Sequence, residues 1–220
     1  MNRNVLVVAH QFPPKSGPGV HRSLQLVKYL RDFGYNPIVL AVTEDYIKKK
    51  GFSVDRSLLN QIPDDIKIVR TDFPFLESTI AFFMKMRVFR FFWYFLYPVF
   101  WDQSLSWVSN NKKVCNKLIE DYDIKLVYTS SSPFTVFILG AYLKKKWNIP
   151  WVADIRDPFT DGYMWQFPSK MHWMCMKIWE RNILGKADRV IVNTEEVRKL
   201  YLKRNISSID KLKVITNGYY

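Results

Sequence analysis

Short apolar runs alternate along the chain with longer segments in which apolar residues recur every three or four positions. Residues 5–9 and 38–42 are apolar runs rich in β-branched residues, which is typical of strands buried in a parallel sheet. Between these runs, apolar residues recur at helical spacing at Val20, Leu24, Val27, Tyr29 and Leu30. Gly34 follows this stripe, at a position where a helix commonly ends. The pattern predicts a strand, a loop, a helix and a second strand, joined by a right-handed connection.

The same alternation continues along the rest of the chain. Further strands are predicted at 66–70, 124–129 and 212–216, with two short ones from Trp151 and within 187–195. Helices are predicted at 104–121, 134–147 and 168–184. Strands that alternate with helices over 220 residues indicate a single α/β domain. We expect a Rossmann-like parallel sheet with helices on both of its faces.

Two segments fit this alternation less simply. Residues 46–63 are polar and basic, and we interpret them as a surface loop or short helix over the sheet edge. The predicted helix 168–184 carries an apolar face made of Met171, Trp173, Met174, Met176, Ile178 and Trp179. This face fits either a buried core surface or a second membrane-facing surface, and we favour the core.

The loop after the first strand is the first candidate site. Ligands of parallel α/β sheets bind beyond the carboxyl ends of the strands, which places a site at residues 13–22. The helix that follows offers free backbone N–H groups and the positive end of its dipole, so the loop suits a phosphate or diphosphate. The candidate residues for a donor diphosphate are Gly17, Gly19, His21 and Arg22. The alternative is an ordinary proline–glycine turn.

The spacing of these residues departs from the dinucleotide-binding fingerprint. Gly17, Gly19 and Arg22 form G-x-G-x-x-R, so an arginine stands where G-x-G-x-x-G has its third glycine. Glu44 and Asp45 follow the second strand and are candidate ribose ligands, although many loops carry acids.

A second candidate site follows the strand 124–129. Ser131 and Ser132 offer hydroxyl groups that could hold an acceptor hydroxyl or a phosphate. The alternative is a plain helix cap, with Ser132 before Pro133 at the first helical position.

The strand from Trp151 delivers Asp154, Arg156 and Asp157 into a proline-bearing loop. Charged groups at the end of a buried strand are costly unless they are paired or functional. The alternative is a surface ion pair between Arg156 and one of the two aspartates.

The charge of the chain restricts its partners. A formal net charge of +13 and a pI near 9.7 favour polyanions, which are nucleic acid, an anionic lipid surface or phosphorylated substrates. Residues 73–102 add a nearly apolar, aromatic stretch in which the basic residues Lys85, Arg87 and Arg90 accompany Phe91 and Trp93. Three cations make a transmembrane helix costly. Core packing and an interfacial helix on an anionic membrane both remain open.

No metal site is predicted. Cys115 and Cys175 lie far apart without a metal-binding pattern, which fits free, buried thiols in a reducing compartment. Asp121 and Asp123 form a D-x-D, but they precede a strand and so belong to the wrong end of the sheet. No signal peptide is visible, and we expect a cytoplasmic protein.

Several of these stretches resemble one family. Residues 7–40 resemble the opening of the amino-terminal domain of family-4, GT-B-fold retaining glycosyltransferases, with their "-FPP-x-x-G-G-" loop. The resemblance continues at Ser131–Pro133, at Asp154–Pro158 ("D-x-R-D-P") and at 187–194 ("ADRVIVNT"). Phe159 replaces the tryptophan that usually follows "D-x-R-D-P", and the histidine that many relatives carry near the serine loop is missing.

The resemblance implies sugar transfer from a nucleotide-diphosphate donor to an acceptor hydroxyl, with retention at the anomeric carbon and without a metal. It implies that Asp157 and Asp154 bind or orient the acceptor hydroxyl. The further acceptor-side candidates are Ser131, Ser132, Arg156, Asn193 and Glu195.

The stretch Val214–Gly218 resembles the "V-I-x-N-G" that closes the amino-terminal domain in this family. A second Rossmann-like domain follows there and holds most contacts to the nucleotide sugar. We expect that donor-binding domain to lie outside these 220 residues, and the fragment alone to be inactive.

The basic, aromatic surface predicts a glycan or lipid-linked acceptor at the inner face of the cell membrane, as in synthesis of a surface polysaccharide or glycolipid. Three alternatives from other classes are a dinucleotide-binding Rossmann protein, a non-specific nucleic-acid binder and a non-catalytic membrane adaptor. The sequence carries no recognisable nucleic-acid motif, so no specific nucleic acid is predicted as a partner.

Overall fold

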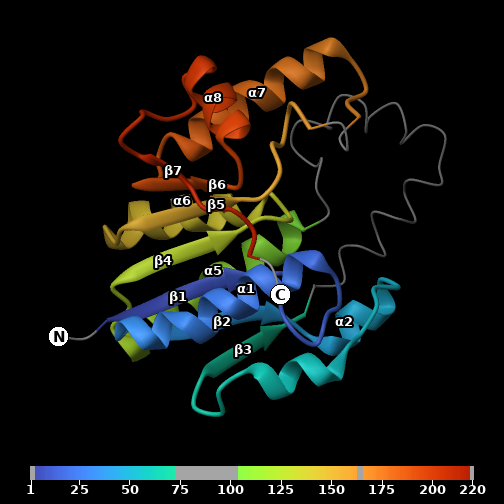
Figure 1. The fold of residues 1–220 in the computed structure, drawn as a ribbon, viewed down its shortest axis with the longest axis vertical. Helices are drawn as coiled ribbons and strands as arrows, with labels where there is room; N and C mark the ends of the chain where they lie inside the picture. The colour runs from blue at the N-terminus through green and yellow to red at the C-terminus, as the bar shows by residue number, and fades with distance from the viewer. Residues whose placement is uncertain (1–2, 73–103, 163–165, 219–220) are drawn as a thin grey trace.

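A seven-stranded, all-parallel sheet forms the centre of the molecule (Figure 1). The computed structural model describes residues 3–72, 104–162 and 166–218. The strands are β1 (Asn4–Ala9), β2 (Asn36–Val42), β3 (Lys67–Thr71), β4 (Leu126–Ser130), β5 (Trp151–Ile155), β6 (Arg189–Val192) and β7 (Leu212–Val214). Their order across the sheet is β3-β2-β1-β4-β5-β6-β7, which confirms the predicted Rossmann-like fold.

The order of the strands reverses beside β1. The chain runs outward from β1 to β2 and β3, and then returns to place β4 on the other side of β1. In this register Ala9 lies opposite Ser130, so the loops after β1 and β4 leave the sheet side by side. Parallel sheets open a crevice at the carboxyl ends of such a pair of strands.

Helices cover both faces of the sheet, as predicted. They are α1 (Pro18–Leu30), α2 (Glu44–Lys49), α5 (Leu105–Tyr122), α6 (Val136–Trp147), α7 (Lys170–Leu184) and α8 (Glu195–Lys203), with 3₁₀ turns at Arg31–Phe33 and Arg56–Gln61. Alternate residues of β1 face opposite ways: Leu6 and Val8 join the core beneath α5 and α6, whereas Val5 and Val7 pack with Val27 of α1. This two-sided burial explains why the central strands are apolar throughout.

Local sequence sets the ends of several helices. Gly34 adopts a left-handed conformation with φ of 74° and ends the 3₁₀ turn after α1, as its position predicted. Thr194 caps α8 by accepting a hydrogen bond from the Val197 N–H. Asp123 ends α5 in a left-handed conformation, so the D-x-D lies at a helix end, ahead of β4.

The interpretation of residues 46–63 as surface was wrong in part. Tyr46 and Ile47 of α2 are buried, and Leu58 of the following 3₁₀ turn packs against α1. The few apolar residues of this segment are separated by polar ones, and α2 is too short for a helical repeat to be recognised from the sequence.

The interpretation of the α7 face as core was also wrong in part. Met176 is fully buried, but Met171, Met174 and Ile178 are more than half exposed. Cys175 lies beside them and is exposed, which corrects the expectation of two buried thiols, while Cys115 is buried as expected. One side of α7 therefore packs, and the side with Met171, Met174 and Ile178 does not.

The predicted aromatic segment at 73–101, with Lys85, Arg87, Arg90, Phe91 and Trp93, lies outside the described residues. Among the helices of the described ranges, none is both long and apolar enough to cross a membrane.

Candidate functional site

The candidate site is the carboxyl edge of the sheet around the β1–β4 crevice. The loops after β1, β4, β5 and β6 meet there, because parallel strands all end at the same edge. The fold thereby brings together residues that the sequence analysis selected from four separate stretches. They are Gly17, Gly19, His21, Arg22, Ser131, Ser132, Asp154, Arg156, Asp157, Asn193 and Glu195.

The loop between β1 and α1 is held by two neighbouring segments. Arg70 of β3 donates a hydrogen bond of 2.6 Å to the carbonyl of Pro13. Lys15 forms an isolated antiparallel bridge with Val54, and the Asp55 N–H donates to the Pro14 carbonyl at 2.7 Å. The loop is therefore a fixed part of the site.

The two glycines of this loop have different physical roles. Gly17 has a φ of 126°, a conformation that side chains rarely adopt, so glycine is required there for backbone reasons. A Cβ atom at Gly19 would lie 1.9 Å from both Arg156 Nη1 and Gln11 Oε1. Glycine at position 19 thus makes room for the Arg156 guanidinium against the first turn of α1.

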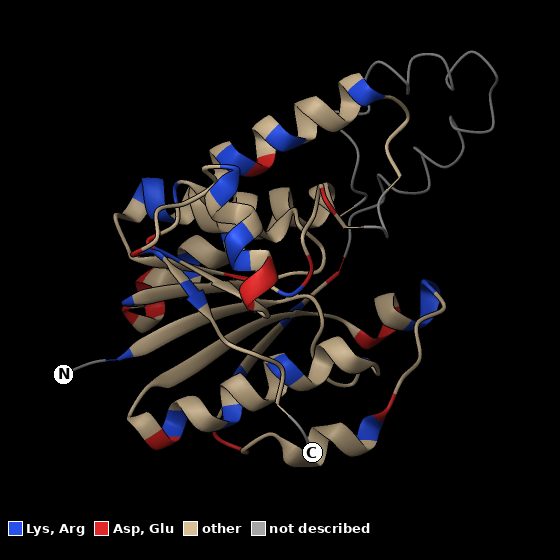
Figure 2. Ribbon diagram, turned by 45° about the horizontal axis from the view of Figure 1, so that its top comes forward, with Lys and Arg blue, Asp and Glu red and all other residues tan. Residues whose placement is uncertain are grey.

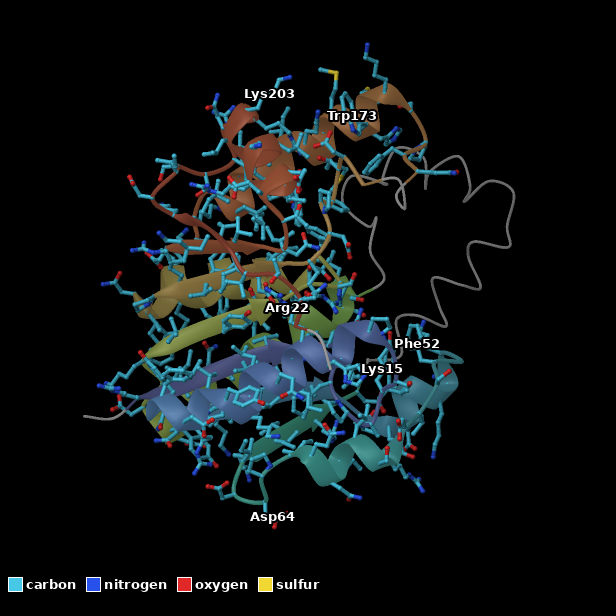
Figure 3. All side chains as sticks on the ribbon, viewed as in Figure 1. Lys15, Arg22, Phe52, Asp64, Trp173 and Lys203 are labelled. Carbon is cyan, nitrogen blue, oxygen red and sulfur yellow. The ribbon has the colours of Figure 1, made fainter. Side chains whose placement is uncertain are left out.

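Arg22 is committed to contacts within the chain. Its Nε and Nη2 atoms donate to the two carboxylate oxygens of Asp154 at 2.8 and 2.7 Å. Its Nη1 atom donates to the carbonyl of Ile215 at 3.0 Å and to Asn217 Oδ1 at 3.2 Å. Arg22 therefore joins α1, β5 and the segment after β7 (Figure 3).

Asp154 lies completely buried beneath the site. Besides Arg22 it accepts a hydrogen bond of 3.2 Å from Ser130 Oγ. Burial, together with the charge of Asp154, raises the pKa of Tyr128 well above its ordinary value. Neither ion pair considered from the sequence forms, because the partner of Asp154 is Arg22, 132 residues away. No local pattern could have identified that partner.

Arg156 and Ser131 are tied to each other. The Arg156 backbone N–H donates to Ser131 Oγ at 3.2 Å, and the Arg156 Nε donates to the Ser131 carbonyl. The alternative of a helix cap at Ser132 was wrong, because α6 begins at Val136, three residues beyond Pro133. The serine loop after β4 is therefore bonded to the loop after β5 at the carboxyl edge of the sheet.

The remaining predicted residues differ in their exposure and in the contacts that they make with the rest of the described chain. Asp157 is exposed, and its side chain makes no hydrogen bond or ion pair with the described part of the chain. Asn193 Oδ1 is buried and has no hydrogen-bond partner within the same described ranges. Glu195 is exposed and pairs with Arg198 at 2.7 Å, while His21 is half-buried in the first turn of α1.

Lys15 is a site residue that the sequence analysis missed. It is only 7% exposed, and its Nζ atom lies 3.7 Å from the centre of the Phe52 ring (Figure 3). Burial, and then the charge of Arg156, lowers the pKa of Lys15 to about 8. A lysine between Pro14 and Ser16 gave no pattern from which its burial could be inferred.

One cavity of the described chain lies far from this edge. It has a volume of about 340 Å³ and is lined by Gly185, Asn205, Ile206, Ser207, Ser208 and Lys211, which precede β6 and β7. Within the described residues, no three His, Cys, Asp or Glu side chains are grouped as metal ligands would be.

Comparison with solved structures supports the fold. Sucrose-phosphate synthase from Thermosynechococcus elongatus superposes with a TM-score of 0.60 at 14% identity, over 99% of this chain and 49% of that one. A putative UDP-N-acetylglucosamine 2-epimerase from Listeria monocytogenes gives 0.55 at 13% identity, over 97% and 45%. A UGT transferase from Siraitia grosvenorii in complex with UDP gives 0.50 at 12% identity, over 98% and 50%.

This chain spans about half the length of each of these three structures. At such low identities the likeness shows the fold alone, and a transferase and an epimerase share that fold. A search of curated protein sequences gives no match. The family model described as Glycosyltransferase Family 4, however, matches residues 19–219. Since this match covers nearly the whole chain, the protein belongs to glycosyltransferase family 4 and carries the amino-terminal domain of its GT-B fold.

Proposed function

We propose that this domain binds the acceptor in a glycosyltransferase that uses a nucleotide-diphosphate sugar. The bond between the anomeric carbon and the donor diphosphate would break with its electron pair on the diphosphate, a bond to the acceptor oxygen would form, and the acceptor proton would pass to the departing diphosphate. Retention of configuration and independence of metal ions are part of this proposal. The observation that carries it is the convergence of four loops at the β1–β4 crevice in a family-4 chain.

Within this proposal the residues of the edge divide into two groups. Asp157 and the Ser131–Ser132 loop contact the acceptor, because the Asp157 carboxylate is exposed and unpaired within the described chain. Arg22 and Asp154 hold the crevice in shape, because their charged groups are used up by each other and by the segment after β7. The amino terminus of α1, with Gly17 and Gly19, faces the departing diphosphate.

The test is steady-state kinetics of the full-length enzyme with Asp157→Asn. A hydrogen bond to a charged group is worth about 1.5–3 kcal/mol, so we expect kcat/KM for the acceptor to fall by about 10- to 100-fold. Asp64→Asn is the matched control, because Asp64 is exposed near the opposite edge of the sheet (Figure 3). Equal activities of the two variants would contradict the role of Asp157.

We further propose that the acceptor is presented at an anionic membrane surface, as a lipid-linked or surface glycan. Met171, Met174, Cys175 and Ile178 form an exposed apolar face on α7. The only acid of this helix, Glu180, is fully buried, while Lys170 and Arg181 are exposed. Figure 2 shows several basic positions along α7. An apolar stripe on a helix that exposes cations and no acid of its own matches a bilayer of anionic lipids.

This second part is tested by sedimentation of the full-length protein with phosphatidylglycerol vesicles. Met174→Asp with Ile178→Asp should reduce the bound fraction at least severalfold, because each change opposes burial of the α7 face and repels the anionic lipid. Asp substitutions at the exposed, non-α7 positions Phe33 and Ile209 provide the control. Unchanged binding of the α7 variant would remove α7 from the proposed membrane surface.

A further inference from the structure

Two cations at the carboxyl edge are buried without an ion-pair partner in the described part of the chain. Lys15 is 7% exposed and Arg156 is 8% exposed. In the described ranges no carboxylate lies within ion-pair distance of either side chain. By contrast, Arg22 is paired with Asp154, and Arg204 with Glu180 at 2.8 Å. Burial of an unpaired charge is unfavourable, so this arrangement needs a compensating anion.

The contacts that these side chains do make leave charge available. Lys15 Nζ lies over the Phe52 ring, which attracts the ammonium charge but does not neutralise it. The N–H groups of Lys15 can therefore still bind an anion. Arg156 uses its Nε on the Ser131 carbonyl. Its Nη1 atom lies directly over Gly19 at the start of α1, where the helix dipole is positive.

The positive charges of Lys15 and Arg156 influence each other. The charge of Arg156 opposes protonation of Lys15, and the charge of Lys15 in turn opposes protonation of His10. Asp154 and Asp157 both favour the charged form of Arg156, but neither is ion-paired with it, because Asp154 is bound by Arg22 and Asp157 is exposed. Three cations, Lys15, Arg22 and Arg156, thus face two carboxylates. The loops after β1 and β5 thus concentrate positive charge at one point of the crevice.

We propose that Lys15 and Arg156 form a binding site for a phosphoryl group of a substrate. The planar guanidinium and the ammonium group suit phosphate oxygens as a fork and a point charge. Arg22, the arginine first suggested by the sequence for this purpose, already donates from all three guanidinium nitrogens to acceptors within the chain. The proposal rests on the proposed glycosyl transfer, in which the phosphoryl group belongs either to the donor diphosphate or to a phosphorylated acceptor.

The first experiment titrates inorganic pyrophosphate into the full-length protein by calorimetry. Lys15→Met should weaken binding at least about tenfold, because a charge-assisted hydrogen bond is lost. Lys67→Gln is the matched control, since Lys67 is an exposed lysine at the start of β3, on the opposite edge. Equal affinities of the two variants, or no binding of pyrophosphate to the unchanged protein, would overturn the site.

A melting curve guards against a misfolded variant. Without an anion, Lys15→Met should melt at the same or a higher temperature than the unchanged protein, because an unpaired buried charge has been removed. With pyrophosphate, only the unchanged protein and Lys67→Gln should gain melting temperature. A Lys15→Met protein that still gains as much would contradict the proposal.

The source of the phosphoryl group is separated by UDP and farnesyl diphosphate as two further probes. Loss of UDP binding in Lys15→Met assigns the site to the donor, and loss of farnesyl diphosphate binding assigns it to a lipid diphosphate acceptor. Lys15-dependent binding without any sugar transfer would refute the proposed function and keep the site. Sugar transfer with a Lys15→Met variant that binds both probes normally would refute the site and keep the function.

Discussion

Individual side chains at the carboxyl edge hold segments that are distant in sequence, and the Arg22–Asp154 pair is the clearest case. Both side chains are buried, with 10% and 1% exposure, and both carboxylate oxygens accept a hydrogen bond from the guanidinium. Removal of one partner leaves the other as an uncompensated charge in the interior. Such a loss exceeds the value of the pair itself, because the remaining charge stays desolvated.

We expect Arg22→Met to lower the free energy of unfolding by about 3–5 kcal/mol in urea denaturation. The double variant Arg22→Met with Asp154→Leu should recover most of this loss, because no buried charge remains. Arg198→Met, which breaks the exposed Arg198–Glu195 pair, should cost at most about 1 kcal/mol. A double variant as unstable as the single one would show that shape, and not charge, decides the effect.

Gly19 offers a test of positioning by a single methyl group. In Gly19→Ala the new Cβ would displace the ends of the Arg156 and Gln11 side chains, which are flexible, so the fold should persist. Displacement of a binding group by about 1 Å can cost about 100-fold in rate. We expect a loss of turnover of this order in the full-length enzyme with an unchanged melting temperature. Gly218→Ala, in open space, is the control.

His10 makes stability depend on pH. Burial, and then Lys15, lowers the pKa of His10 from 6.5 to about 3. Below pH 6.5 the unfolded chain therefore takes up a proton that the folded protein does not, so stability falls as the pH drops towards 3. Since Tyr46 and Trp107 contact the His10 ring by its edges, His10→Phe preserves the packing.

We expect urea denaturation between pH 7 and 4 to show a shallower loss of stability in His10→Phe than in the unchanged protein. Lys15 is the charged group that acts on His10 within the described chain, and with a pKa of about 8 it stays mostly protonated over that range. Parallel pH profiles of the two proteins would contradict the assignment of this dependence to His10.

At the scale of the elements, α6 is fixed on the sheet by a glycine. A Cβ atom on Gly140 would lie 2.3 Å from the ring of Trp151 in β5, which is itself fully buried. Because this ring also donates to Thr129 Oγ1 at 2.9 Å, it has no free direction in which to move. The glycine thus sets the distance between helix and sheet.

Gly140→Ala should destabilise the protein by about 1–3 kcal/mol in urea denaturation, although alanine favours a helix, because the site is already filled. Lys145→Ala on the exposed side of the same helix should stay within about 0.5 kcal/mol. A neutral or stabilising Gly140→Ala would mean that α6 can move away from β5.

The elements were largely predictable from the sequence, since their patterns are local. The runs at 5–9 and 38–42 gave β1 and β2, and the glycine at 34 gave the end of the first helical segment. The exposed face of α7 was not predictable, because methionine and isoleucine at helical spacing look alike whether or not another surface covers them. The burial of Tyr46 and Ile47 was missed because α2 has only six residues.

At the scale of the whole molecule, the sequence predicted that the candidate residues share one edge of the sheet, but it did not predict the contacts among them. The rule that parallel strands end together brought Gly17, Ser131 and Arg156 to one crevice. Asp154 pairs with Arg22 and not with Lys15 or Arg156. This choice depends on side chains that follow β1, β4 and β5, which are far apart in the sequence. The pairing is a long-range property, so Lys15 was overlooked and Arg22 was first given a ligand, although all three of its guanidinium nitrogens already donate within the chain.

Arg22 also connects the site to the segment after β7, through its hydrogen bonds to Ile215, Thr216 and Asn217. These partners lie more than 190 positions further along the chain. If the segment after β7 unfolds locally, the hydrogen bonds from Arg22 Nη1 to that segment break, and this guanidinium also pairs with Asp154. In native-state hydrogen exchange, the amides at the start of α1, at the end of β5 and after β7 should therefore open together as one cooperative unit. The beginning, the middle and the last described residues of this chain would then report on a single event.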